Sequence, residues 1–88
     1  MQSPGFRSAD DVCAEARRMI EAAIPGARAE VTAASPGHFE ISVTAQAFGG
    51  KSPVQQQQMV YKAIAPLMSG DAPPMHAVDR LKVTAAGG

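Results

Sequence analysis

Residues 38–45 read HFEISVTA, and every second residue, beginning with Phe39, is apolar. This alternation is typical of a β-strand with one buried face. A second strand-like run begins with HAV and occupies residues 76–84, and one helical segment, from Ser52 to about Met68, lies between the two runs. A strand–helix–strand unit normally makes a right-handed crossover between parallel strands. We therefore expect these two strands to be parallel neighbours in one sheet.

The residues before this unit predict a helix and one more strand. Ser8 and Asp11 have the spacing of a capping box, and apolar residues then recur at helical spacing until Pro25-Gly26. Residues 28–33 alternate between polar and apolar, and a Ser35-Pro36-Gly37 turn follows. With residues 38–45 they predict a hairpin.

The second helix is also delimited by its own sequence. Ser52 and Gln55 form another capping box, with Pro53 at the first helical position, and Pro66 should break the helix near Ala65. We expect four residues to share the apolar face of this helix: Val54, Tyr61, Ala65 and Met68. The order α-β-β-α-(α)-β predicts an α+β domain, with helices packed on one face of a three-stranded mixed sheet.

Length and composition predict one small domain. We expect a flexible tail over residues 1–7, the domain over residues 8–84 and a second flexible tail over residues 85–88. Eight basic residues balance eight acidic ones, which argues against a protein whose main function is to bind nucleic acid through its phosphates.

The chain has one cysteine, so no intrachain disulfide can form. We expect Cys13 to be a small residue in or beside the core rather than a metal ligand. No stretch has the apolar character of a signal peptide or a membrane helix. We therefore expect a soluble, cytoplasmic protein that does not bind membranes.

No arrangement typical of an enzyme appears. There is no Ser/His/Asp set, carboxylate pair or metal-protease pattern. Gly50-Lys51-Ser52 resembles the end of a phosphate-binding loop, but Ala45 stands where that motif needs glycine. A flexible turn followed by a capped helix explains the same residues.

The two histidines are the candidate site. His38 and His76 each begin one of the two strands, and the first residues of neighbouring parallel strands lie about 5 Å apart. The two imidazoles can then share one site, and no acidic residue has ligand spacing with them.

Three motifs point to a known family: FxGxSxV at residues 48–54, VY at 60–61 and HAV at 76–78. Together they resemble the BolA family over roughly residues 9–84. Gln57-Gln58, shortly before the Val-Tyr pair, resembles the IbaG (YrbA-like) branch.

The resemblance implies a class II KH-like fold, αββααβ, and partnership with a monothiol glutaredoxin. In such heterodimers a [2Fe–2S] cluster is shared, with the glutaredoxin cysteine and glutathione on one side and BolA histidine on the other. The resemblance places the principal ligand at His76 and a second ligand at His38. It implies a role in iron–sulfur trafficking or in iron and stress regulation. Alone, we expect a monomer or weak dimer without a bound cofactor.

The chain departs from many BolA proteins at Gln56–Gln58, where they have Arg-His-Arg. This difference removes charge from the helix often proposed to touch DNA. The alternative, a KH-like nucleic-acid-binding transcriptional regulator, would have to rely on Lys51, Lys62, Arg80 and Lys82. We expect that binding to be weak and strongly dependent on salt. A second departure is Arg80 at a usually aliphatic position, which predicts a β-bulge near Asp79-Arg80.

Overall fold

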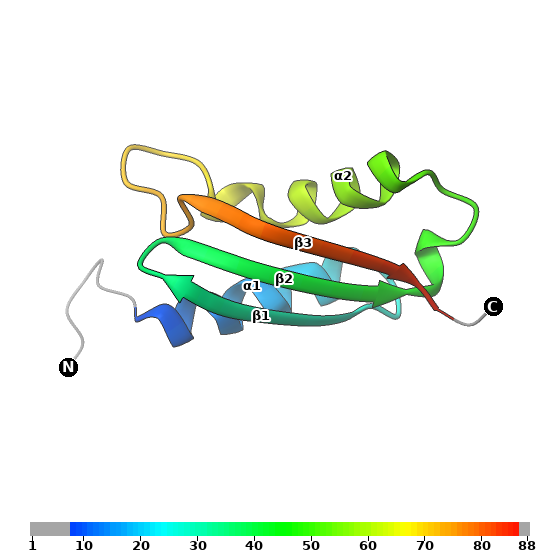
Figure 1. Cartoon of the computed structure of the whole chain (residues 1–88), viewed down its shortest axis with the longest axis horizontal. Coiled ribbons are helices and arrows are strands. Elements are labelled where there is room, and N and C mark those ends of the chain that lie inside the picture. Colours follow the sequence, from blue (N-terminus) through cyan, green and yellow to red (C-terminus); the bar gives the residue numbers. More distant parts are fainter. Residues whose placement is uncertain (1–7, 87–88) are drawn as a thin grey trace.

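The computed structural model describes residues 8–86 and has the expected order of elements (Figure 1). The elements are α1 (Ala9–Ala23), β1 (Arg28–Ser35), β2 (His38–Ala45), the 3₁₀ turn η1 (Gln46–Phe48), α2 (Pro53–Ile64), the 3₁₀ turn η2 (Ala65–Leu67) and β3 (Ala77–Ala85). The tail expected at residues 1–7 lies outside the described residues, as do residues 87–88 of the tail expected at 85–88. Within the described residues, neither helix combines the length and the hydrophobicity needed to cross a bilayer.

Both helices begin at the predicted capping boxes. The Ser8 hydroxyl accepts the N–H of Asp11 at 3.0 Å, and the Ser52 hydroxyl accepts the N–H of Gln55 at 3.2 Å. Each of these bonds satisfies an N–H that has no partner inside the helix. The predicted break before Pro66 is also confirmed, because α2 ends at Ile64 and continues as η2.

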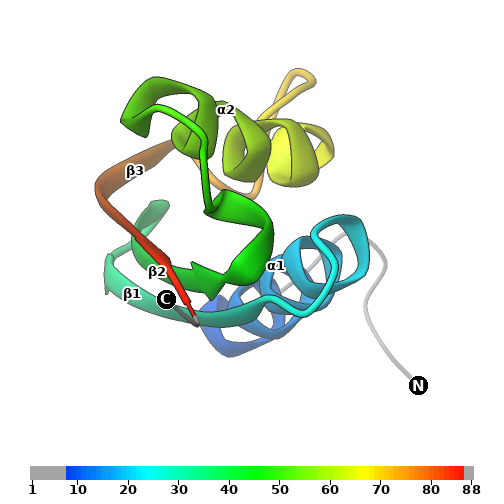
Figure 2. The same ribbon diagram turned by 90° about the vertical axis from the view of Figure 1, so that its right-hand side faces the viewer.

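The sheet has the order β1-β2-β3, with β1 antiparallel to β2 and β2 parallel to β3 (Figure 1). The predicted crossover between parallel neighbours is therefore confirmed. Both helices cover one face of the sheet and leave the other face open (Figure 2). The last strand extends to Ala85, one residue further than expected, and the N–H of Ala86 donates to Ala45 O at 3.1 Å.

A bulge shifts the pairing of β2 with β3, as predicted. Phe39 pairs with Val78 but Glu40 pairs with Arg80, so Asp79 is an extra residue in β3. Without it, strict alternation would put Leu81 on the open face of the sheet. The bulge keeps Leu81 partly buried against the core, on the same face as Val78.

The core lies between the helices and the sheet, and it corrects the expected face of α2. Val60 and Ile64 are fully buried, whereas Val54 is 62% exposed and Tyr61 is 39% exposed. Val60, Ile64 and Leu67 follow one another at helical spacing, and the face that they form carries only aliphatic side chains. Burying Tyr61 instead would require a hydrogen-bond partner for its hydroxyl. The buried residues are Val12, Ala16, Ile20, Ile24, Ala29, Phe39, Ile41, Val43, Ala45, Phe48, Val60, Ile64, Leu67 and Met75.

The connection before α2 is anchored at both ends rather than loose. Phe48 is fully buried. The Gln56 side-chain amide donates to Phe48 O and to Lys51 O, each at 3.0 Å. Gln56 therefore takes part in the packing of this connection.

Candidate functional site at the histidine end of the sheet

The two histidines lie at the same end of the sheet, as the crossover predicts. His38 is paired with Ala77 across the β2–β3 ladder, so His76 lies one residue before its partner position. The carbonyl oxygen of Gly37 accepts the N–H of His76 at 2.8 Å and that of Ala77 at 3.1 Å. The backbone before one histidine thus holds the backbone of the other.

Gly37 also forms the surface against which the His76 ring packs. A Cβ at residue 37 would lie 3.0 Å from both Cγ and Nδ1 of His76, closer than side chains normally allow. The residue has φ +78°, a conformation that strains L-residues. The turn therefore needs glycine both for its backbone and for the position of the imidazole.

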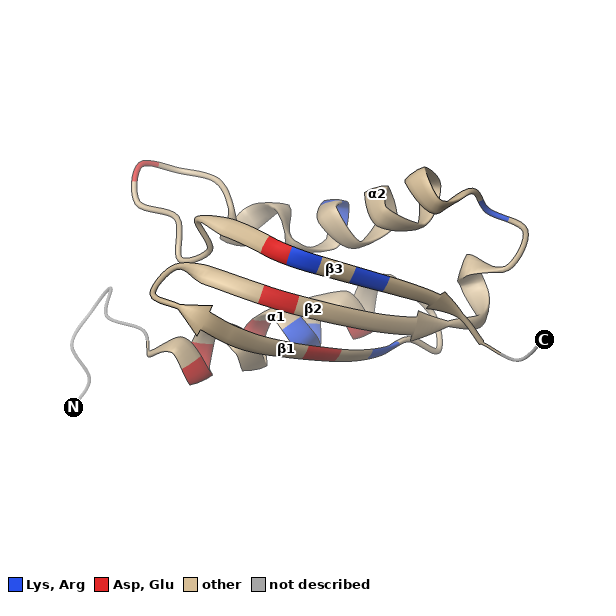
Figure 3. Cartoon of the chain, viewed as in Figure 1, with Lys and Arg blue, Asp and Glu red and all other residues tan. Residues whose placement is uncertain are grey.

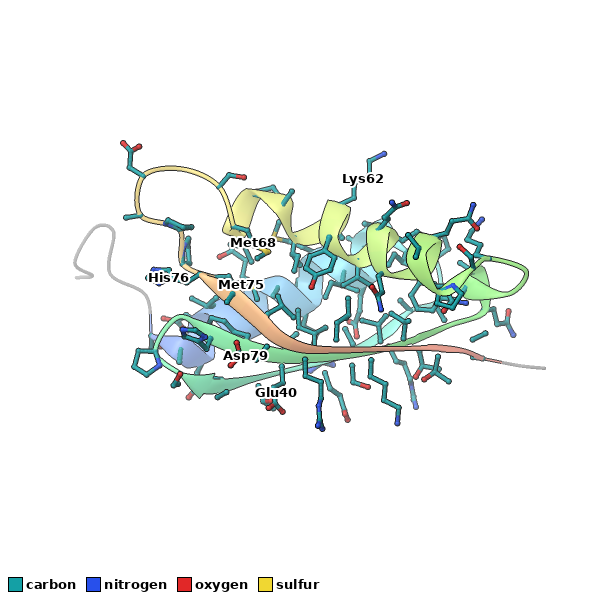
Figure 4. The ribbon with its side chains drawn as sticks, turned by 45° about the horizontal axis from the view of Figure 1, so that its top comes forward. Glu40, Lys62, Met68, Met75, His76 and Asp79 are labelled. Atoms are coloured by element: carbon teal, nitrogen blue, oxygen red, sulfur yellow. The ribbon has the colours of Figure 1, made fainter. Side chains whose placement is uncertain are left out.

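His76 is exposed although it follows a buried residue. Met75 is fully buried and its N–H donates to Leu67 O at 3.0 Å, which fixes the chain just before the histidine. Among residues 8–86, the His76 ring takes part in no hydrogen bond or ion pair. Figure 4 shows His76 at the end of the sheet where β3 begins. Its ring is therefore available to an external ligand.

His38 has a partner that the sequence reasoning missed. Its Nδ1 lies 2.9 Å from Oδ1 of Asp79, and the two side chains are 44% and 43% exposed. The expectation that no acidic residue has ligand spacing with the histidines did not anticipate this hydrogen-bond partner. The signal was the expected bulge, which leaves Asp79 outside the regular pairing with Glu40.

A shallow groove of about 480 Å³ lies beside the turn that joins β1 to β2. Its lining is largely apolar and comes from Ala9, Val12, Ala33, Ala34, Ser35, Pro36, Gly37, Phe39 and Pro74. Gly37 and Pro74 belong to the two segments that carry the histidines. The end of the sheet that carries both histidines therefore adjoins a surface of low polarity.

The basic residues considered for nucleic-acid binding are divided between two surfaces. Lys51 and Lys62 line a depression beside α2, whereas Arg80 and Lys82 lie on the open face of the sheet with Glu40 (Figure 3). An acidic residue beside the second pair offsets its charge. The structure does not gather these four side chains into one basic patch.

Cys13 lies on α1 and is partly buried against the core, as expected. Burial, and to a smaller extent the charge of Asp10, raises the pKa of its thiol above the ordinary value. The thiolate form that binds metals is therefore disfavoured. Among the described residues, no three His, Cys, Asp or Glu side chains are grouped so as to hold a metal ion.

The model of the BolA-like protein family matches residues 16–86, which include the parallel strands, the crossover helix and both histidines. The chain belongs to the BolA-like family. The BolA1 protein of Mus musculus has a similar structure, with a TM-score of 0.64 and 28% identity over 97% of this chain and 75% of that one.

Two further BolA-like structures share the fold. A BolA homologue from Coxiella burnetii has a TM-score of 0.61 and 24% identity over 90% of this chain and 92% of its own. A Bol-like protein from Babesia bovis has a TM-score of 0.59 and 24% identity over 92% of this chain and 88% of its own. No curated protein sequence matches significantly.

Proposed function

We propose that this BolA-like chain is a non-enzymatic adaptor that pairs with a monothiol glutaredoxin and supplies histidine ligands to a shared [2Fe–2S] cluster. The observation that carries the proposal is the exposed ring of His76, which has no hydrogen-bond partner among residues 8–86 and lies at the same sheet end as His38. In this proposal His76 is the principal ligand and His38 the second.

The donor set fits such a cluster. Imidazole ligation suits iron centres with potentials above those of clusters held only by cysteine. Imidazole also titrates near neutral pH and can leave the metal. Both properties suit a cluster that is passed on to another protein or sensed. The cluster, when bound, supplies the iron and sulfide that are transferred or read out.

The chain's own residues fix and expose the ligands. The Gly37 carbonyl accepts the backbone N–H of His76, and the buried Met75 anchors the chain immediately before this histidine. Two imidazoles do not complete the coordination of two irons. The proposal therefore assigns the other ligands to the glutaredoxin cysteine and to glutathione, and it assigns the groove beside Gly37 to the contact with the partner.

We also infer that the chain is closest in function to the IbaG branch. The glutamines in α2 support this inference, since they replace the basic residues that a DNA-binding helix would use. The separation of the basic side chains over two surfaces also disfavours a nucleic-acid regulator.

The test is reconstitution with iron, sulfide, glutathione and a monothiol glutaredoxin, followed by visible absorption and circular dichroism. Adding the parent chain should change the spectrum of the glutaredoxin cluster and produce a heterodimer. His76→Ala should keep the far-ultraviolet spectrum of the fold but alter the visible dichroism and shorten the lifetime of the cluster.

Lys82→Ala is the matched control, because it truncates an exposed side chain on β3, the strand that follows His76. It should behave like the parent. A parent chain that leaves the glutaredoxin spectrum unchanged, or a His76→Ala variant with the parent's spectrum and lifetime, would contradict the proposal.

A further inference from the structure

We propose that Asp79 is a positioning residue: its carboxylate fixes the tautomer of His38 and directs the Nε2 atom of that ring outward as the ligand atom. The part that concerns ligation rests on the adaptor function proposed above. The part that concerns the tautomer rests on the geometry of this chain alone.

The contact that carries the inference joins two side chains that are 41 positions apart in the sequence. His38 Nδ1 and Asp79 Oδ1 are separated by 2.9 Å, the length of a good hydrogen bond. An ionised carboxylate can only accept hydrogen bonds. The proton of this bond therefore belongs to Nδ1, and in the neutral ring Nε2 keeps its lone pair.

The bulge in β3 makes this contact possible. In a regular ladder the residue after Val78 would pair with Glu40, so the carboxylate of Asp79 would lie directly opposite the carboxylate of Glu40. Like charges in that position destabilise a sheet. The extra residue instead brings Arg80 opposite Glu40 and leaves Asp79 to turn to His38. The bulge thus places Arg80 opposite Glu40 and gives His38 a hydrogen-bond partner, Asp79.

The chemistry matches the known use of such pairs. A histidine that binds metal usually donates its other ring N–H to a carboxylate or carbonyl, which sets the tautomer and orients the ring. His38 has this partner, whereas the ring of His76 is hydrogen-bonded to no described residue. The two imidazoles therefore differ: a hydrogen bond to Asp79 orients the His38 ring before a partner binds, whereas the His76 ring only packs against Gly37.

The tautomer can be measured without any cluster. Long-range ¹H–¹⁵N spectra of the labelled chain, recorded near pH 8.5 where an ordinary imidazole is neutral, distinguish protonated from unprotonated ring nitrogens. The parent should show His38 mainly protonated at Nδ1. Asp79→Ala should shift His38 towards the Nε2–H form and leave the His76 pattern unchanged.

Two further variants make the measurement specific. Asp71→Ala removes an exposed carboxylate from the loop before β3 and should leave His38 as in the parent. Asp79→Asn keeps the size of the side chain and should give a tautomer ratio between those of the parent and Asp79→Ala. A parent His38 protonated mainly at Nε2, or a ratio that is the same with and without Asp79, would overturn the proposal.

Reconstitution with glutaredoxin tests the ligation. Asp79→Ala should shorten the lifetime of the shared cluster by roughly tenfold, the lower end of the effect of removing such an outer partner, and Asp71→Ala should not. The double variant His38→Ala/Asp79→Ala should match His38→Ala, because Asp79 acts through that ring.

The two proposals fail in different ways. If the parent changes no glutaredoxin spectrum, the adaptor function fails and the tautomer spectra still judge the role of Asp79. If His76→Ala alters the cluster while Asp79→Ala matches the parent, the adaptor function stands and the positioning role in ligation is overturned.

Discussion

The Gly37 carbonyl oxygen and the His76 backbone N–H form a hydrogen bond of 2.8 Å, and the His76 ring occupies the space that a side chain at residue 37 would need. The turn that precedes His38 therefore supports His76. A change in this turn should affect stability and imidazole position together.

Gly37→Ala should lower the free energy of unfolding by about 1–3 kcal/mol, because alanine is strained at positive φ and its methyl group meets the His76 ring. Gly26→Ala is the matched control, since Gly26 has φ +72° but no atom within 4 Å of an added Cβ. Denaturant unfolding should show the larger loss for Gly37→Ala, and only that variant should move the His76 ring resonances. Equal losses and unchanged His76 resonances would contradict the contact.

The corrected face of α2 gives a second prediction. Ile64→Ala should destabilise the protein by about 2–5 kcal/mol, because it leaves a cavity in the core. Val54→Ala, which truncates a side chain that is 62% exposed, should change the stability by less than about 0.5 kcal/mol. Chemical denaturation of the two variants decides which face of α2 is buried. A larger loss of stability for Val54→Ala than for Ile64→Ala would support the face expected from the sequence.

The fold could be predicted from the sequence because its signals are local. Both helix starts are set by hydrogen bonds within four residues, as in Ser52 and Gln55. The strand from His38 to Ala45 is set by its own alternation, and the helical crossover to the next strand then makes that strand parallel to it. The same logic placed the two histidines at one sheet end.

The parts that the sequence did not predict depend on contacts between distant segments. The buried face of α2 depends on what α1 and the sheet present to it, so spacing alone could not choose Val60 over Tyr61. The partnership of Asp79 with His38 depends on which residue is extra in the bulge. A bulge was expected near that point, but its register is fixed only when the pairing of β2 with β3 is known.

The bulge also predicts an effect of charge reversal on the open face of the sheet. Arg80→Glu puts two carboxylates directly opposite each other, because Glu40 is the pairing partner of Arg80. It should cost about 0.2–1 kcal/mol relative to a neutral pair. Lys82→Glu is the control, since Lys82 pairs with Ser42. Urea unfolding at low and high salt should show the larger loss for Arg80→Glu, and this difference should narrow as salt screens the charges.

Glu21 gives the last prediction, a dependence of stability on pH. Its carboxylate accepts the backbone N–H of Ala29 at 3.1 Å, which ties the end of α1 to β1. This hydrogen bond, helped by the charge of Arg17 and opposed by desolvation, lowers the pKa of Glu21 below its ordinary value of 4.5.

Because of this lowered pKa, the Glu21 carboxylate binds a proton more weakly in the folded protein than in the unfolded chain. The resulting stabilisation is complete above the ordinary pKa and is lost as the pH falls through the lowered one. Glu21→Gln should be less stable than the parent near pH 7, and the difference in stability should close as the pH falls from the ordinary pKa through the lowered one. Glu30→Gln, which removes a carboxylate from an exposed position on β1, is the control. Thermal unfolding of the three proteins across this range is the measurement, and a gap for Glu21→Gln that stays constant down to acid pH would show that its carboxylate does not hold Ala29 as a charged acceptor.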